Sequence, residues 1–294
     1  MRILVSGTSG LIGSRLVLTL EANRAHEVYR LVRRPAGSNR EIVWDSRLQA
    51  HQVRGFDAVI HLAGETIMGR WTASKKARIL QSRTTTTSQL AQALATADIR
   101  PRSFLVASAI GYYGAQGTDV LMEDSPPGQG FLSQVCQQWE ASAEPARRAG
   151  IRVAHLRFGM VLTPEGGALR TMLLPFRLGL GGRVGSGEQW MSWMALDDVV
   201  AAIVFTLGAE SLAGPVNIVT PNPVTNAEFT RALGRALHRP TLFPLPAAVV
   251  KVILGEMGQA LLLSSQRAVP SKLESSGHRF LHPELDEALR SMFL

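Results

Sequence analysis

The chain has 294 residues, of which 46% are hydrophobic, so it can bury a sizeable core in one large α/β unit or in a nucleotide-binding domain with a smaller partner domain. Its 31 basic and 23 acidic residues give a formal net charge of +8. The arginines are scattered as singles and pairs, without a basic stripe or a nucleic-acid-binding motif, so we expect no nucleic-acid partner. A phosphorylated ligand accounts for some of this charge.

The composition also indicates the compartment. The single cysteine, Cys136, excludes an intrachain disulfide and suits a reducing cytoplasm, where we expect it to be a buried thiol. The apolar runs are much shorter than the roughly 20 residues that a membrane-spanning helix needs. The chain enters a strand at its N-terminus, so we expect no targeting peptide, no membrane partner and a cytoplasmic protein.

Residues 3–13 read Ile-Leu-Val-Ser-Gly-Thr-Ser-Gly-Leu-Ile-Gly, a short apolar strand followed by three glycines spaced three apart and then an amphipathic helix. Gly7 can adopt a positive φ in the tight turn, and Gly10 lets a diphosphate approach the backbone. Gly13 allows close packing of the helix on the strand. The free amides of the helix N-terminus attract an anion, so the segment predicts a dinucleotide-binding turn.

A second strand over 28–32 ends at Arg33-Arg34-Pro35, about twenty residues beyond Gly13. An acidic residue here would bind the ribose 2′-hydroxyl of NAD, whereas arginine suits the 2′-phosphate of NADP. Arg33 and Arg34 therefore favour NADP as the cofactor. The alternative interpretation is a solvated charge pair at the end of a strand.

Residues 56–65 predict another buried parallel strand that runs into a turn of small residues, whose backbone lines the cofactor. His61 is expected to be a core histidine at the end of this strand, because the sequence offers no catalytic partner for it. A helix is predicted over 71–97, and a further strand over 103–109 is followed by Ile-Gly-Tyr-Tyr-Gly at 110–114.

A helix over 131–148 and a strand over 152–157 continue the alternation of strands and helices, which predicts an α/β fold with a doubly wound parallel sheet of the Rossmann type. Beyond 159 the glycine content rises, and Trp190 and Trp193 are expected either to stack on a ligand or to lie in the core. Asp197-Asp198 is predicted to cap a helix, and 216–218 to return to the sheet.

Thr225 and Glu228 have the spacing of a capping box, and the chain beyond Pro240 is expected to be helical. We therefore predict a dinucleotide-binding domain over 1–160, completed by about 195–220. Residues 161–194 and 221–294 are expected to form a smaller, mainly helical C-terminal substrate domain.

Taken together, these features resemble the extended short-chain dehydrogenase/reductase superfamily. The segments 71–83, 108–114, 175–193, 221–229 and 266–270 are similar to its atypical epimerase-family subgroup, which has its own C-terminal domain. The resemblance implies a diphosphate site at Gly7, Gly10, Leu11, Ile12 and Gly13, and a 2′-phosphate site at Arg33 and Arg34. It also implies cofactor contacts from Leu62, Ala63 and Gly64 at the end of a strand, and from Arg83 on the following helix.

The chain departs from the superfamily at the residues that perform its chemistry. The superfamily uses a tyrosine as acid/base and a lysine four residues later, on the helix after the loop that covers the ligand. Aligning on Glu140 places Leu132 and Cys136 at these positions, and neither can replace the pair. Tyr113 and Ser108 at the sheet edge are the first candidates for a catalytic role. The other candidates are Tyr112, Glu65 and Glu123.

Two functions follow from these observations. The first is an NADP-dependent oxidoreductase or sugar-nucleotide epimerase that acts on a small molecule between the two domains. The second is a catalytically silent NADP-binding sensor or scaffold, because a fold alone does not determine function. A homodimer is compatible with either function.

Overall fold

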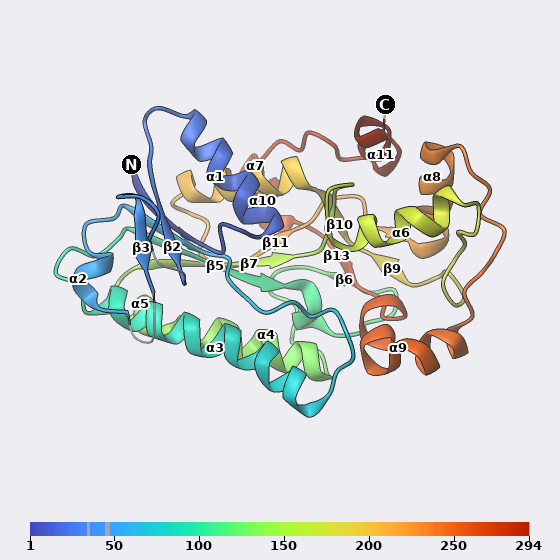
Figure 1. The fold of residues 1–294 in the computed structure, drawn as a ribbon, viewed down its shortest axis with the longest axis horizontal. Helices are drawn as coiled ribbons and strands as arrows, with labels where there is room; N and C mark the ends of the chain where they lie inside the picture. The colour runs from blue at the N-terminus through green and yellow to red at the C-terminus, as the bar shows by residue number, and fades with distance from the viewer. Residues whose placement is uncertain (34–35, 45–47, 294) are drawn as a thin grey trace.

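A seven-stranded parallel sheet, in the order β11-β7-β5-β4-β1-β2-β3, forms the centre of the computed structural model (Figure 1), which describes residues 1–33, 36–44 and 48–293. The strands are β1 (Arg2–Ser6), β2 (Glu27–Val32), β3 (Glu41–Val43), β4 (Ala58–His61), β5 (Ser103–Ala109), β7 (Arg152–Phe158) and β11 (Gly214–Ile218). The predicted doubly wound α/β fold is confirmed, with β3 as an edge strand that the sequence did not reveal.

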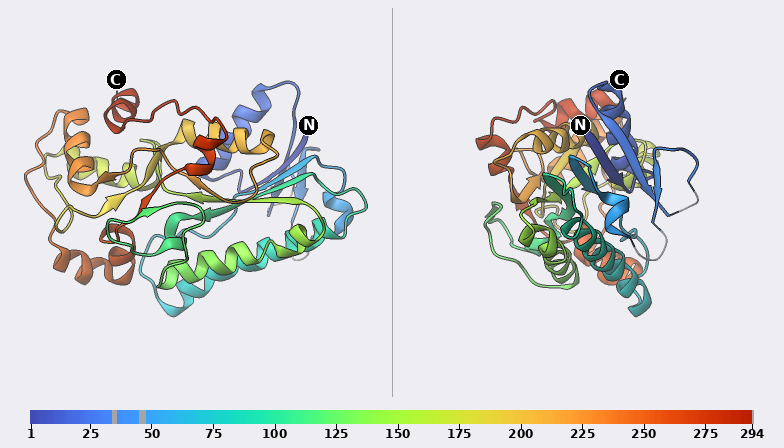
Figure 2. Two further views of the ribbon diagram at one scale, coloured as in Figure 1. Left: turned by 180° about the vertical axis from the view of Figure 1, so that it is seen from behind. Right: turned by 90° about the vertical axis from the view of Figure 1, so that its left-hand side faces the viewer.

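Helices cover both faces of this sheet (Figures 1 and 2). One face carries α1 (Leu11–Ala22), α7 (Leu196–Gly208) and α10 (Ser271–Ser275); the other carries α2 (Ala50–Val53), α3 (Ala73–Ala95), α4 (Phe131–Ala141) and α5 (Glu144–Arg148). Successive residues of a strand point to opposite faces. Ile3 and Val5 of β1 therefore join one apolar core, whereas Leu4 joins the other, which explains why three successive residues of this strand are apolar.

Two predicted helix boundaries differ in the structure. The helix expected over 131–148 is divided into α4 and α5, because Pro145 has no N–H with which to continue a helical hydrogen-bond ladder. The predicted cap at Asp197-Asp198 is wrong, since Ala195 is the N-cap of α7. Asp198 instead accepts the backbone N–H groups of Leu281 and His282, at 2.6 and 2.9 Å.

Beyond the carboxyl ends of the strands lies a second group of elements with its own apolar core (Figures 1 and 2). Trp193 is fully buried in this core and donates from Nε1 to the carbonyl of Asn222, so it has the core role that the sequence left open. The capping box of Thr225 and Glu228 is present at the start of α8, as predicted.

The helices here are α6 (Gly167–Arg177), α8 (Asn226–Leu237), α9 (Ala247–Leu262) and α11 (Leu285–Phe293), with the 3₁₀ turn η1 (Ile110–Tyr113) at the sheet edge. The short strands are β6 (Val120–Leu121), β8 (Met160–Leu162), β9 (Trp190–Met191), β10 (Trp193–Ala195), β12 (Val224–Thr225) and β13 (Arg267–Ala268). The predicted domain boundaries stay predictions. No helix in the described part of the chain has the length and apolar character needed to cross a bilayer.

His61 is the last residue of β4 and is fully buried, as predicted for a core histidine. Its Nδ1 lies 2.6 Å from Ser6 Oγ of the neighbouring strand β1, and its Nε2 lies 3.3 Å from Thr86 Oγ1. Burial lowers the pKa of His61 from 6.5 to about 4. The folded protein therefore holds this imidazole neutral, whereas the unfolded chain protonates it below its ordinary pKa.

We expect His61 to make the protein sensitive to acid. Its contribution to the free energy of unfolding is fully present above pH 6.5 and is lost as the pH falls toward about 4. Between about pH 7 and about pH 5 the loss amounts to about 2 kcal/mol. Urea unfolding of the wild type and of His61→Asn at both pH values measures it, because other buried histidines contribute equally to both proteins. An equal loss of stability in the two proteins would contradict the assignment.

Candidate cofactor and active site

The turn between β1 and α1 has the close contacts that the glycine pattern predicts. Gly7 has a φ of +74°, a conformation that glycine adopts without steric cost. A Cβ on Gly13 would lie 2.2 Å from the carbonyl oxygen of Gly7, and one on Gly7 would lie 2.7 Å from the carbonyl carbon of Leu62. The turn therefore packs directly against both its own helix and the end of β4.

The N-terminus of α1 is suited to an anion. Its N-cap, Gly10, provides no side chain to accept the first amides, and no acidic residue occupies the first turn. The amides of Leu11, Ile12 and Gly13 belong to this first turn, where a helix leaves N–H groups without intrahelical acceptors. The positive end of the helix dipole adds to their attraction for a diphosphate.

The end of β4 brings a cation to the same edge of the sheet. Leu62, Ala63 and Gly64 follow the strand, and a Cβ on Gly64 would lie 3.3 Å from the guanidinium carbon of Arg83 on α3. This guanidinium also lies over the Trp139 ring, 4.9 Å from its centroid, and donates to the carbonyl of Ile79 at 3.0 Å. Arg83 is therefore held against the backbone that the sequence assigns to the cofactor.

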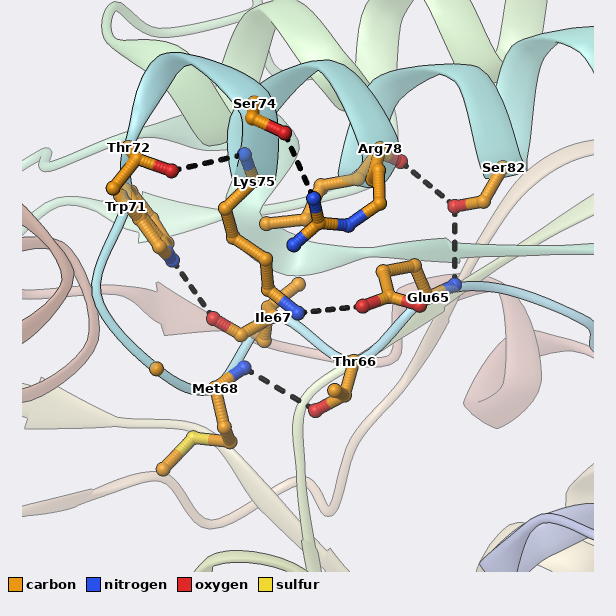
Figure 3. Close-up of polar contacts among 12 residues, drawn as sticks. Glu65, Thr66, Ile67, Met68, Trp71, Thr72, Ser74, Lys75, Arg78 and Ser82 are labelled. Carbon is orange, nitrogen blue, oxygen red and sulfur yellow. Dashed lines mark hydrogen bonds and ion pairs between the residues drawn. The ribbon is translucent and has the colours of Figure 1, made fainter.

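Glu65 and Lys75 form an ion pair next to this turn (Figure 3), with 2.6 Å between Lys75 Nζ and Glu65 Oε1. The Lys75 side chain is only 10% exposed, whereas that of Glu65 is 35% exposed. The hydrogen bond and charge of Lys75 hold the pKa of the Glu65 carboxyl below its ordinary value. The backbone N–H of Glu65 donates to Ser82 Oγ at 3.0 Å, which fixes the start of the loop to α3.

This loop explains why sequence reasoning named Glu65 but missed Lys75. Thr72 caps α3 by accepting the backbone N–H of Lys75, and Trp71 donates from Nε1 to the carbonyl of Ile67 at 2.7 Å (Figure 3). The chain thus turns back on itself between Glu65 and Lys75. A lysine at the start of an amphipathic helix carries no signal in the sequence that such a fold-back will bury it.

Arg33 lies exposed directly after β2, at the carboxyl edge where the sequence places a 2′-phosphate. Arg34, the other predicted ligand of this phosphate, lies outside the described residues. Of the two arginines predicted to bind the 2′-phosphate, the structure therefore describes Arg33.

Tyr113, the first catalytic candidate, is completely buried in η1. Its hydroxyl donates to Asn217 Oδ1 at 2.7 Å and accepts from Arg157 Nη1 at 2.9 Å. Burial raises the pKa of Tyr113 to about 12. A phenol that is enclosed, satisfied and hard to ionise is poorly suited to proton transfer with a substrate. These contacts support a structural role for Tyr113.

Ser108, the second catalytic candidate, is also buried, and its hydroxyl donates to Glu140 Oε1 at 2.7 Å. Glu140 forms a two-pronged ion pair with Arg157, at 2.8 and 2.9 Å. The Arg157 side chain is only 3% exposed, and its guanidinium lies 3.5 Å from the centroid of the Tyr112 ring. Arg157 thus connects the two hydroxyl groups, that of Tyr113 by a direct hydrogen bond and that of Ser108 through Glu140. Both hydroxyls are therefore part of one buried hydrogen-bond network.

Leu132 and Cys136 lie on α4 against the same 3₁₀ turn. A Cβ on Gly111 would lie 3.3 Å from Leu132 Cβ and 3.8 Å from Cys136 Sγ. Cys136 is buried, as predicted, and burial together with the nearby Glu140 carboxylate raises the pKa of its thiol to about 12. The Arg83 guanidinium opposes this rise in the pKa of Cys136, so a cation lies near the position where the superfamily has its lysine.

Two family models match separate parts of the chain. Residues 3–218 match the NAD dependent epimerase/dehydratase family, and residues 245–292 match a domain of unknown function. The chain belongs to the NAD dependent epimerase/dehydratase family. An epimerase family protein of Mycobacterium bovis is 43% identical over 98% of this chain and 96% of that protein.

Two solved structures of this family have the same fold. The crystal structure of human epimerase family protein SDR39U1 with NADPH has a TM-score of 0.91 and 37% identity, and each chain covers 99% of the other. A nucleoside-diphosphate sugar epimerase from Corynebacterium glutamicum has a TM-score of 0.83 and 32% identity over all of this chain and 58% of that one. The suspected relationship to the extended dehydrogenase/reductase superfamily is thereby confirmed.

We expect the buried ion pair of Arg157 and Glu140 to be critical for stability. Arg157→Met leaves a carboxylate without its cation in the interior, which costs about 3 to 5 kcal/mol of unfolding free energy. Urea denaturation measures the loss. The matched control is Arg147→Met, because Arg147 forms an exposed pair with Glu144 that contributes little. Equal stability of the two variants would contradict this role of Arg157.

Proposed function

We propose that the protein is an NADP(H)-dependent oxidoreductase or epimerase of the short-chain dehydrogenase/reductase type. The observation that carries this proposal is the convergence, at one edge of the sheet, of the glycine turn, the uncapped end of α1 and the contact of Gly64 with Arg83. A human relative whose structure was determined with NADPH supports the choice of cofactor. The substrate is a small molecule that binds between this edge and the C-terminal helices.

Each predicted cofactor residue has a role in this proposal. The first-turn amides of α1 bind the diphosphate, and Arg33, with Arg34, binds the 2′-phosphate. Leu62, Ala63 and Gly64 present their backbone to the cofactor. Bound NADP(H) supplies or accepts the hydride. Arg83 provides positive charge beside the nicotinamide ribose, in place of the superfamily lysine whose position Cys136 occupies.

We assign proton transfer to Glu65 rather than to Tyr113 or Ser108. Its carboxylate is partly exposed at the cofactor edge, and Lys75 holds it in the ionised form, which is the form that accepts a proton from a substrate hydroxyl as that substrate is oxidised. The lowered pKa makes it a weaker base than an unpaired carboxylate. Lys75 positions the carboxylate from α3. The hydroxyls of Tyr113 and Ser108 are already engaged by Asn217 and Glu140.

A second candidate function is an NADP-binding sensor without chemistry. The specific observation in its favour is that Leu132 and Cys136 place an apolar side chain and a protonated thiol where the superfamily transfers protons. Such a protein binds the cofactor but turns over no substrate.

The cofactor assignment predicts at least tenfold tighter binding of NADP than of NAD. Charge-assisted hydrogen bonds to the 2′-phosphate contribute about 1.5 to 3 kcal/mol. Calorimetric titration with both nucleotides measures the difference, which Arg33→Ala should reduce. Arg24→Ala removes the same charge from an exposed position after α1 and should leave the preference unchanged. Equal affinity for NADP and NAD would overturn the assignment.

The proton-transfer assignment predicts that Glu65→Gln lowers kcat by about 10² or more on any substrate that the wild type oxidises. A panel of sugar nucleotides and small alcohols, followed by NADP reduction, identifies such a substrate. Glu144→Gln, which changes an exposed carboxylate on α5, is the matched control. Tyr113→Phe should lower the free energy of unfolding, because it removes a buried hydrogen bond, and should change kcat much less than Glu65→Gln does.

The same panel separates the two functions. Tight NADP binding with no turnover across the panel favours the sensor. Turnover that survives Glu65→Gln but is abolished by Tyr113→Phe restores the role that the sequence assigned to Tyr113.

A further inference from the structure

Residues 66–71, between the two partners of the Glu65–Lys75 ion pair, form a fold-back loop. Figure 3 shows the Lys75 side chain extending from α3 into the turn of this loop. That side chain is nearly buried, although a lysine is rarely buried unless it is paired. The burial of Lys75, and with it the strength of its attraction for Glu65, therefore depends on where the fold-back loop lies.

The middle of the fold-back loop is held only loosely by the loop itself. The backbone N–H of Met68 donates to Thr66 Oγ1 at 3.3 Å, and both Met68 and Arg70 are exposed. The end of the loop is better fixed, because the Trp71 ring packs edge-on against Phe131 at the start of α4, with 5.1 Å between the centroids. Segments with few long-range contacts open readily, so the exposed middle needs support from another element.

This support comes from α9, at a kink in the helix. Gly255 has a φ of +57° and a ψ of −140°, and the two residues that follow it contact the loop and the start of α3. Met257 is only 6% exposed, and its Sδ accepts the backbone N–H of Gly69 at 3.2 Å. Glu256 Oε2 lies 2.5 Å from Lys76 Nζ. Figure 1 accordingly shows α9 beside the N-terminal end of α3.

The second half of α9 is a fixed support for this contact. The carbonyl of its last residue, Leu262, accepts a hydrogen bond from Gln189 Nε2 at 2.9 Å, just ahead of β9. The ion pair of Glu256 with Lys76 is partly exposed and contributes little to stability. Met257 is buried and apolar, so it contributes more. Met257 is thus the main side chain through which the C-terminal region holds the fold-back loop.

We propose that Met257 is a positioning residue for Glu65, because it holds the fold-back loop over Lys75 and so shields the ion pair from water. This inference rests on the proposed function, in which Glu65 transfers the proton. Glu65 also lies in the field of Arg78 and Arg83, which are on α3 with Lys75. These cations stay on α3 when the loop opens, so opening chiefly hydrates Lys75 and screens its attraction for the carboxylate.

The first test measures the pKa of Glu65 and needs no substrate. The full-length protein is isotope-labelled at its glutamate carboxyl carbons and titrated by nuclear magnetic resonance, and Glu65→Gln identifies the Glu65 signal. In Met257→Ala we expect the pKa of Glu65 to rise toward its ordinary value. The matched control is Val252→Ala, which shortens an 85% exposed side chain of α9 and should leave this pKa as in the wild type. The same pKa in both variants overturns the proposal.

A second measurement follows the loop itself. Trypsin cuts after exposed arginines, so the native-state rate of cleavage after Arg70, followed by mass spectrometry, reports how often the loop opens. We expect cleavage at least about fivefold faster in Met257→Ala than in Val252→Ala, because the open population rises. Met257→Leu keeps the apolar volume and should restore most of the protection. Equal cleavage rates in Met257→Ala and Val252→Ala would contradict the proposed contact.

A third readout separates positioning from a merely structural role. With a substrate that the wild type oxidises, the acid limb of the kcat/KM profile should move to higher pH in Met257→Ala and return in Met257→Leu. Lower activity with an unmoved acid limb would overturn the positioning role. The titration and the proteolysis do not depend on turnover. If Glu65→Gln leaves kcat unchanged, the proposed function is contradicted, while these two measurements still decide whether Met257 acts on Glu65.

Discussion

One buried cation, Arg157, organises the junction between the central sheet and the elements around it. Its guanidinium joins Glu140 on α4, the Tyr113 hydroxyl in η1 and the carbonyl of Glu123, all at hydrogen-bonding distance. A charge this deeply buried is tolerated only when its donors are paired, so the surrounding elements must keep their positions. The Tyr113 hydroxyl also donates to Asn217 of β11, so this strand is held by the same network. The Asn217 side chain in turn donates to the carbonyl of Val269, ahead of α10.

This network has a direct consequence for function. It engages the hydroxyls of Tyr113 and Ser108, the groups at the sheet edge that the sequence offered as substitutes for the missing tyrosine and lysine. The Glu65 carboxylate, by contrast, is partly exposed near the end of β4, where it pairs with the buried Lys75. Membership of the family thus indicates the cofactor edge of the sheet, while the proton-transfer group proposed above depends on residues particular to this site.

The cofactor edge and the C-terminal region face each other across the ends of the parallel strands (Figure 1). Arg33 and Arg83 bring positive charge from β2 and α3, and Arg267 brings it from β13. In the function proposed above, Arg33 and Arg83 recognise the dinucleotide. Part of the positive net charge of the chain therefore lies where the proposed function places a polyanionic cofactor.

Patterns that depend on neighbouring residues could be read from the sequence alone: the glycine turn at Gly7, Gly10 and Gly13, the alternation of strands and helices, and the capping box of Thr225 and Glu228. Their physics is local, because backbone conformation and packing period act over a few residues. Only the tertiary structure decided what Tyr113 and Asp198 do. Tyr113 bonds to Asn217, 104 residues away, and Asp198 accepts from Leu281, 83 residues away. Such partners are brought together by the packing of whole elements, which no local pattern encodes.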